Sequence, residues 1–259
     1  LFGPWAESLP NWQYVDTSKP VRHDFSESTD GLEAPWGSAQ LTLIANKTTL
    51  DTPPQSAIEL LALAEKNKGR ITYPKPPMFI GTTFLKQVLS EVITDKTLLQ
   101  QPVTEATFAQ ASAPLWAYLD KLHAVAWREG KAFPINDTQM DQQLADNELL
   151  LSMTFNPNKG ANAVASGALP PSTYSFGFAS GMIGNIHFVA IPFNAKAKAG
   201  AQVLANFLLS PEAQARKADR TIWGDPSILD ARKLDSTPSA AIHPSATGGL
   251  ITNVPTLLE

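Results

Sequence analysis

The sequence predicts an α/β fold, because short apolar runs alternate with longer stretches of helical periodicity. Residues 40–45 and 148–155 are the clearest strands, since each is a short apolar run bounded by polar or turn-forming residues. The clearest helix starts near residue 81, after which apolar side chains recur at helical spacing as far as Ile93. Strands that are separated by helices favour mostly parallel sheets with helices on both faces.

Local signals place the other elements. Residues 1–37 are rich in Gly, Pro and Trp and have little periodicity, so they are expected to be largely irregular. Pro114 separates two helical stretches and suits the first turn of the second. Further helices are predicted at 56–69, 104–111, 114–128, 137–145, 160–166, 195–209, 210–218 and 226–234. Further strands are predicted at 70–73 and, interrupted by glycines, at 174–192.

Residues 73–84, Tyr-Pro-Lys-Pro-Pro-Met-Phe-Ile-Gly-Thr-Thr-Phe, join a predicted strand to the clearest helix. The prolines fix φ and oppose an early helical start, so the helix is expected to open at Gly81. Thr82 or Thr83 then has a side chain suited to capping it. Backbone N–H groups at a helix N-terminus favour negative charge, so this loop is also a candidate site for a small anionic or polar group.

Composition excludes several classes of function. The chain has 259 residues, a net charge of −4 and no block of Lys and Arg, which argues against nucleic acid as a partner. It contains no Cys, so a thiol nucleophile, a disulfide and a thiolate metal site are all excluded. Its apolar runs fall short of the ~18 residues that a membrane span needs.

No catalytic template is present in the sequence. There is no Gly-x-Ser-x-Gly elbow, no His-Glu-x-x-His pair and no phosphate-binding loop that ends in Lys-Ser or Lys-Thr. The four histidines are far apart in the sequence, and His123 and His187 are interpreted as structural imidazoles. We therefore expect a protein that is not an enzyme and that holds neither a metal nor a cofactor.

Six short motifs follow one another along the chain. The first three are Pro-Trp-Gly at 35–37, Leu-Thr-Leu-Ile-Ala at 41–45 and a capped helix start at Ser56. The others are Gly-Arg-Ile-Thr-Tyr-Pro at 69–74, Gly-Thr-Thr-Phe-Leu at 81–85 and Ser-Pro-Glu-Ala-Gln at 210–214. Over residues 1–235 this set resembles the type 2 periplasmic solute-binding proteins of ABC importers, and among them the little-characterised branch that is assigned to thiamine transport.

The resemblance implies a two-lobed type 2 periplasmic-binding-protein fold that closes on a ligand held between its lobes. Lobe 1 would comprise residues 1–38 and 188–259, and lobe 2 residues 39–187. The hinge crossings would lie near 36–45 and 181–191. Family members carry roughly 100 further N-terminal residues, so lobe 1 is expected to be incomplete, with an exposed sheet edge and exposed core surface.

The resemblance also implies ligand-binding positions in the first hinge, the loop before the clearest helix, the end of the second clear strand and a late Trp–Asp pair. These candidates are Trp36, Gly37, Ser38, Gly81, Thr82, Thr83, Phe155, Asn156, Trp223 and Asp225. Structural alternatives stay open: both tryptophans and Phe155 suit a core, and Asp225 suits a helix cap. Relatives that bind ferric iron use pairs of tyrosines, whereas the tyrosines here are scattered, so iron is not expected.

The function implied is that of a periplasmic, monomeric binding protein that delivers a small polar solute, thiamine or a related compound, to a membrane permease. A solute that bridges both lobes shifts an open–closed equilibrium. An aromatic cation would stack on Trp36 or Trp223 near Asp225, whereas a phosphorylated or sulfonated group would sit at residues 81–83. The alternatives are a hydrolase or transferase on the same scaffold and a sensory ligand-binding domain.

Overall fold

The computed structural model describes residues 3–25, 27–235, 242, 256 and 257, and it confirms the α/β class. Its helices are α1 (Ala57–Lys66), α2 (Phe79–Val92), α3 (Glu105–Val125), α4 (Asp137–Ala145), α5 (Lys159–Ala165), α6 (Lys198–Leu208) and α7 (Pro211–Ala218). Its strands are β1 (His23–Asp24), β2 (Glu27–Ser28), β3 (Glu33–Gln40), β4 (Thr42–Asn46), β5 (Leu151–Thr154), β6 (Thr173–Phe176), β7 (Met182–Ala190) and β8 (Thr256–Leu257). Short 3₁₀ turns are η1 (Ala6–Ser8), η2 (Pro10–Tyr14), η3 (Lys96–Gln100), η4 (Trp127–Gly130) and η5 (Ala231–Lys233).

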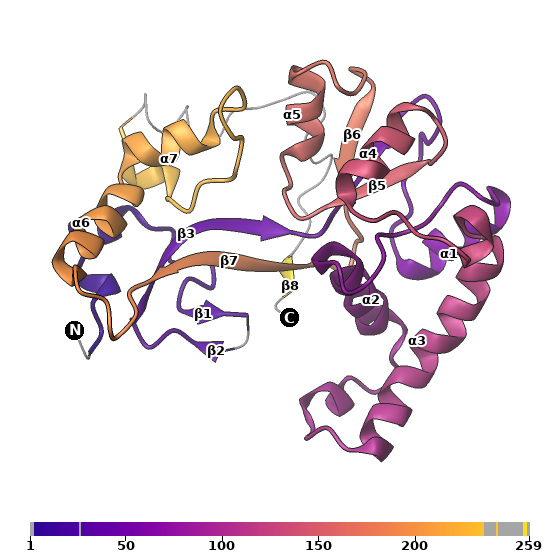
Figure 1. Cartoon of the computed structure of the whole chain (residues 1–259), viewed down its shortest axis with the longest axis horizontal. Coiled ribbons are helices and arrows are strands. Elements are labelled where there is room, and N and C mark those ends of the chain that lie inside the picture. The colour runs from indigo at the N-terminus through magenta and orange to yellow at the C-terminus, as the bar shows by residue number, and fades with distance from the viewer. Residues whose placement is uncertain (1–2, 26, 236–241, 243–255, 258–259) are drawn as a thin grey trace.

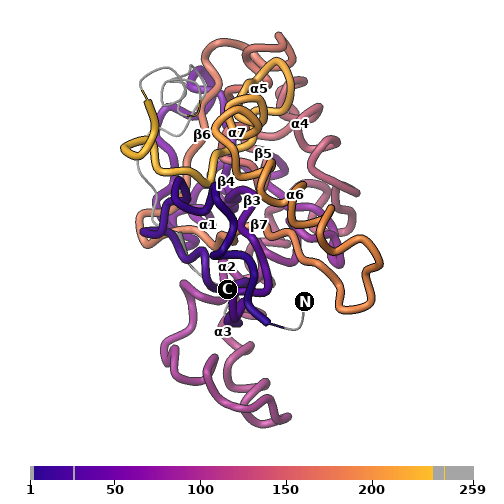
Figure 2. The backbone as a smooth tube through the Cα atoms, turned by 90° about the vertical axis from the view of Figure 1, so that its left-hand side faces the viewer, coloured from indigo at the N-terminus to yellow at the C-terminus, as the bar shows by residue number. Residues whose placement is uncertain are grey.

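Two bodies, each with its own hydrophobic core, are joined by the long strands β3 and β7 (Figure 1). The core of the larger body lies among β4, β5, β6 and helices α1 to α4, and it includes Leu43, Phe84 and Phe176. The core of the smaller body lies among η1, η2, α6 and the outer part of β3 and β7, and it includes Trp5 and Leu229. Helix α3 projects beyond the rest of the larger body, and the same projection is visible after a turn of 90° (Figure 2).

The direction of strand pairing differs from the expectation. Strand β4 lies between β5 and β6 and is antiparallel to both, so that Ile44 stands opposite Ser152 on one side and Ser175 on the other. Strands β5 and β6 therefore run in the same direction, but β4 separates them. Strands β3 and β7 are also antiparallel, and in the described part of the chain parallel pairing joins β7 to β8. The prediction of mostly parallel sheets is wrong for these strands. After the chain crosses from the smaller body, β4 enters the sheet between β5 and β6 and runs opposite to both.

Helix periodicity and capping are confirmed in most places. Helices α1, α4, α5, α6 and α7 lie where the sequence predicts them. Ser56 accepts a hydrogen bond from the Glu59 N–H at 3.2 Å and caps α1. Ser210 caps α7 through the Ala213 N–H, also at 3.2 Å, and Pro211 occupies its first turn. Side-chain caps therefore mark the starts of α1 and α7, whereas α5 and α6 begin without one.

Four local predictions are wrong, and in each a tertiary contact overrides the local signal. Residues 70–73 are not a strand, and the Arg70 and Ile71 carbonyls instead accept single hydrogen bonds from the Leu150 and Trp127 N–H groups. Residues 33–37 are strand and not irregular, since β3 pairs with β7 on both sides of an irregularity at Trp36. Residues 105–125 form one helix with Pro114 inside it, and the buried face that begins at Leu115 keeps this helix continuous across the missing N–H. The helix predicted at 226–234 is absent apart from η5, because Leu229 pairs with Val15 in an isolated bridge.

Candidate functional site

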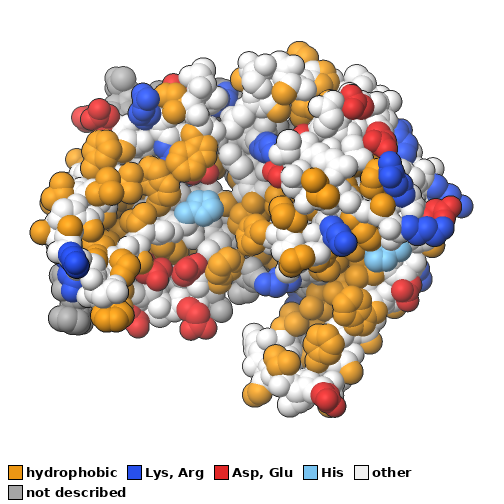
Figure 3. Space-filling view, viewed as in Figure 1, with side chains coloured by type: hydrophobic (Ala, Val, Ile, Leu, Met, Phe, Trp, Pro, Cys, Tyr) orange, Lys and Arg blue, Asp and Glu red, His pale blue; other side chains and the backbone are white. Residues whose placement is uncertain are grey.

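Three neighbouring cavities form one cleft where the two bodies meet (Figure 3). The central cavity, of about 400 Å³, is lined by Ala39, Met78, Phe79, Ile80, Asp137, Thr154, Phe155, Asn156, Lys159, His187, Trp223 and Asp225. A second cavity, of about 410 Å³, shares Phe79, Phe155 and His187 with it. A third, of about 530 Å³, shares Asn156, Lys159 and Trp223. Because the cavities share walls that come from both bodies, the cleft is the candidate site.

Two phenylalanines form an aromatic wall of the cleft. Phe79 is the first residue of α2 and 47% exposed, and Phe155 directly follows β5. Their rings meet edge to face with centroids 4.8 Å apart. Phe155 is thus at the cleft surface and packs only in part against the larger core. A flat or apolar portion of a ligand would find its contact here.

The loop that carries Gly81, Thr82 and Thr83 lies differently from the expectation. Helix α2 begins two residues earlier, with Met78 at its N-cap and no side-chain cap, so the prediction that Thr82 or Thr83 caps it is wrong. The Thr82 N–H donates to the Met78 carbonyl at 2.9 Å, and the buried Thr83 hydroxyl donates to the Phe79 carbonyl at 2.9 Å. The first φ free of proline follows Pro77, so the helix starts there. Met78, Phe79 and Ile80 line the cleft in place of residues 81–83.

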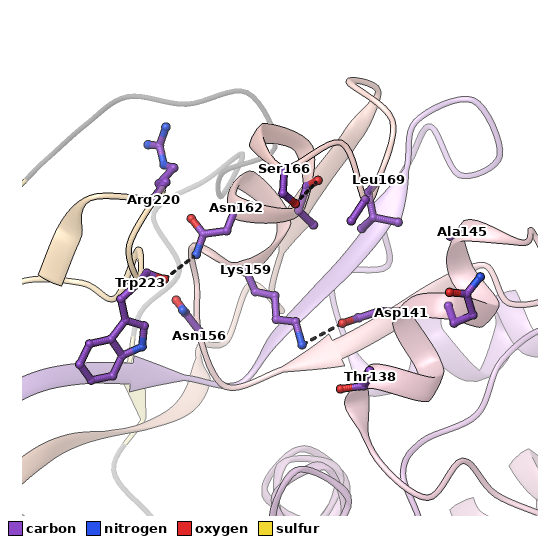
Figure 4. A pocket seen from close by; sticks show the side chains of 13 residues that line it. Thr138, Asp141, Ala145, Asn156, Lys159, Asn162, Ser166, Leu169, Arg220 and Trp223 are labelled. Carbon is purple, nitrogen blue, oxygen red and sulfur yellow. Dashed lines mark hydrogen bonds and ion pairs between the residues drawn. The ribbon is translucent and has the colours of Figure 1, made fainter.

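Lys159 lines the cleft and contacts two carboxylates, of which Figure 4 shows Asp141. Its Nζ is 2.8 Å from Asp137 Oδ2 and 2.8 Å from Asp141 Oδ2. Burial raises the pKa of Asp141, although Lys159 and the Ser152 hydroxyl act in the opposite direction. Burial lowers the pKa of Lys159, but the charges and hydrogen bonds of Asp141 and Asp137 together raise it above its ordinary value. One ammonium faces two carboxylates, so this group does not offer an uncompensated positive charge.

A second ion pair is buried beside β3. Lys217 Nζ is 2.8 Å from Asp225 Oδ2, and the two side chains are only 1% and 6% exposed. The same ammonium donates to the Pro226 carbonyl, and burial lowers the pKa of Lys217 although Asp225 acts to raise it. Asp225 is not a helix cap, because residues 226–230 are not helical. A Cβ added at Gly37 would lie 2.7 Å from each of these charged atoms, so the ion pair packs directly against β3.

The two candidate tryptophans are neighbours at the hinge end of the cleft. Their ring centroids are 6.0 Å apart, and Lys217 Nζ lies 5.1 Å from the centroid of the Trp36 ring. Trp223 is 52% exposed and lines the cleft, so it is not a core residue. Trp36 lies beside the lining and not in it, and Ser38 pairs with Ile186 in the β3–β7 ladder.

Some cleft residues carry no signal in the sequence. Lys159, the first residue of α5, reaches Asp137 and Asp141 of α4 only after the fold has formed. His187 lines two cavities, and only its pairing opposite Gly37 places it there. The aromatic character of Phe79, directly after a proline-rich stretch, is the one local hint that was available.

The tyrosines lie outside the described lining of the cleft. Tyr118 and Tyr174 donate to the backbone carbonyls of Ala57 and Leu50 inside the larger core. Tyr73 pairs through its hydroxyl with His123 Nε2 at 2.8 Å, and Tyr14 packs against the smaller core. The described residues contain no cluster of three or more His, Asp or Glu side chains with the geometry of a metal site. Nor do they include a helix whose length and hydropathy match those of a membrane span.

Comparison with known proteins finds a relative that is similar to most of the chain. Protein YnjB of Escherichia coli (strain K12) is 56% identical over 230 residues, which are 89% of this chain and 59% of that protein. The chain thus spans less than two thirds of this relative.

Solved structures of low identity share the fold. The spermidine/putrescine ABC transporter substrate-binding protein PotD from Streptococcus pneumoniae superposes with a TM-score of 0.64 at 15% identity, over 99% of this chain and 72% of that one. The periplasmic binding protein AfuA from Actinobacillus pleuropneumoniae gives a TM-score of 0.61 at 17% identity, over 99% and 69%. The apo ferric ion-binding protein A of Pasteurella haemolytica gives 0.61 at 11% identity, over 92% and 67%.

All of these structures are of binding proteins and not of enzymes. The sequence model of one family, described as bacterial extracellular solute-binding protein, matches residues 3–243. Because the match covers most of the chain, the protein belongs to the bacterial extracellular solute-binding protein family.

Proposed function

We propose that this chain captures a small solute in the cleft and delivers it to the membrane permease of an ABC importer, as a monomer in the periplasm. The family match and the transporter-associated binding proteins of the same fold support this role. The proposed lobes are residues 1–38 with 188–259, and residues 39–187. Their support is the separation of the two cores, one built from residues between Leu41 and Met182 and the other from residues before Ala34 and after Ile186.

The lining of the cleft favours a solute with a flat ring and a positive charge. The carrying observation is the aromatic wall of Phe79 and Phe155 beside Asp24, whose cavity has no Lys or Arg among its described lining residues. The described residues that line the 410 Å³ cavity include Asp24 and five aromatic or His side chains but no Lys or Arg. Lys159 in the central cavity already faces two carboxylates. Aromatic faces and carboxylates together attract organic cations.

Thiamine, an aromatic cation, is the solute that we propose. Its rings would contact Phe79, Phe155 and Trp223, and its charge would lie toward Asp24 or Asp137. Asp225 is an unsuitable counter-ion, because its carboxylate is buried against Lys217. A phosphorylated or sulfonated solute is less favoured, since residues 81–83 lie within the first turns of α2 and outside the cleft lining.

The test is isothermal titration calorimetry of the chain with thiamine, with thiamine pyrophosphate and the neutral oxidation product thiochrome as controls for charge. We expect a dissociation constant on the order of micromolar for thiamine, equivalent to about −8 kcal/mol, and weaker binding of both controls. Tighter binding of the pyrophosphate would contradict the cationic class. Failure of all three, together with no small molecule released on denaturation of the purified protein, would contradict solute binding itself.

A further inference from the structure

A direct polar contact closes one end of the cleft. Asn162 lies on α5, in the larger body, and the loop of residues 219–225 follows α7 in the smaller body (Figures 1 and 4). The Asn162 amide Nδ2 donates to the Trp223 carbonyl at 3.2 Å and to the Gly224 carbonyl at 3.4 Å. Asn156 Nδ2 reaches the same Gly224 carbonyl at 3.5 Å, the long limit for such a bond.

The loop is shaped to receive this amide. Gly224 has φ of +69°, a conformation that residues with a Cβ rarely adopt. A Cβ added there would lie 2.3 Å from Asn162 Nδ2 and 2.4 Å from its Oδ1. Backbone conformation and the lack of a side chain therefore both allow the loop to lie against Asn162.

We infer that Asn162 is a latch between the lobes, a positioning residue that sets how much of the protein is closed before any solute binds. This inference rests on the proposed function only in assuming that the lobes open and close. In the closed form the amide replaces two contacts with water by two contacts with carbonyls of the other body.

The latch is weak enough to release. Asn162 Oδ1 is buried with no hydrogen-bond partner in the described structure, whereas in an open form water would reach it. The hydrogen bond with water that Oδ1 loses on closing offsets part of the free energy that Nδ2 gains. The latch therefore favours the closed form only slightly. A solute in the adjoining cavity, which Asn162 and Trp223 both line, then needs to supply only the remaining difference.

Distances between two spin labels test the latch without any ligand. The sequence has no Cys, so Ala165→Cys on α5 and Arg216→Cys on α7, both at exposed positions, give two unique labelling sites in the full chain. Pulsed electron–electron double resonance then measures the distribution of distances between the two labels. In Asn162→Asp, an isosteric carboxylate cannot donate and repels both carbonyls, so we expect the ratio of closed to open forms to fall about tenfold.

Ser166→Ala is the matched control, because this hydroxyl lines the same cavity and donates only to the Ala163 carbonyl of its own helix. It should leave the distance distribution unchanged. An unchanged distribution in Asn162→Asp, or an equal shift in both variants, would overturn the latch. These distance measurements need no ligand and do not depend on whether thiamine binds. Calorimetry can therefore contradict the proposed function without contradicting the latch.

A double-mutant cycle isolates the contact itself. Gly224→Ala should open the protein in the wild-type background, where the new Cβ meets the Asn162 amide. In an Asn162→Ala background the same change should open it less, because only the backbone strain at residue 224 is left. Equal effects of Gly224→Ala in both backgrounds would show that Asn162 and Gly224 do not act together, and would overturn the proposal.

Discussion

Phe79 is 47% exposed and lines the cleft, because α2 begins directly after a run of prolines that admits no earlier helical turn. Its partner Phe155 is brought there by β5, whose pairing with β4 ends at Thr154. A side chain that is both exposed and held by an edge-to-face contact is prepared for a ligand ring.

We predict that Phe79→Ala raises the dissociation constant for thiamine about tenfold, equivalent to about 1.4 kcal/mol, because a stacking surface is lost. Titration calorimetry measures it. Phe193→Ala is the control, since Phe193 is 76% exposed and outside the cavities that form the cleft. Equal affinities of wild type and Phe79→Ala would remove this residue from the site.

Lys217 forms a buried ion pair with Asp225 beside β3. We predict that Lys217→Met destabilises the protein by about 3–5 kcal/mol, because it leaves the Asp225 carboxylate buried without a partner. Urea denaturation measures the change. The double variant Lys217→Met, Asp225→Leu should recover most of the loss, since two apolar side chains need no ion pair. A single variant as stable as the double one would show that the pair is not what holds this region.

Helix α2 shows how a neighbouring segment decides what an element presents. The Pro74 carbonyl lies over Gly81, and a Cβ added there would be only 1.9 Å from that oxygen. Gly81 is therefore needed for close packing inside the first turns of the helix and not for binding an anion. Its neighbours Met78 and Phe79 face the cleft as a consequence.

We predict that Gly81→Ala destabilises the protein by about 1–3 kcal/mol, because the new methyl group forces the Pro74–Pro77 stretch away from α2. Thermal denaturation measures it. Gly200→Ala in α6 is the matched control: nothing lies within 4 Å of its added Cβ, so helix propensity should stabilise it by about 0.5–1 kcal/mol. A neutral Gly81→Ala would mean that the contact with Pro74 is loose in solution.

At the scale of the whole molecule, the buried phenols of the larger core give the protein an alkaline limit. Burial raises the pKa of Tyr73 and of Tyr174 to about 12, and burial also raises the pKa of Tyr118. A raised pKa in the folded state means that the folded protein holds the phenol proton more tightly than the unfolded chain does. The associated stability is complete below about pH 10 and is lost as the pH rises toward 12.

We predict that the free energy of unfolding falls between pH 10 and 12 by up to about 1.4 kcal/mol per pH unit for each phenol. Urea denaturation at stepped pH values measures it. Tyr174→Phe should be less stable at pH 8, since it loses the 2.7 Å bond to the Leu50 carbonyl, but should have a shallower fall above pH 10. Parallel curves for the two proteins would exclude this phenol as a cause.

The sequence by itself determined the α/β class, most helix positions and the caps at Ser56 and Ser210, because periodicity and capping act over a few neighbouring residues. It also carried the family resemblance that the comparison of residues 3–243 confirmed. Of the candidate site residues, it placed Phe155, Asn156, Trp223 and Asp225 where the cleft lining has them. Whether they bind a solute stays a prediction.

Tertiary structure alone decided the antiparallel pairing of β4, the charge balance at Lys159 and the contact of Asn162 with Gly224. Each of these joins segments that are distant in sequence, so no local pattern records it. Asn162 and Gly224 are ordinary residues when read singly, and only their approach across the cleft gives them a role. The physical reason is that a cleft between two bodies is made of contacts that exist only after both bodies have folded.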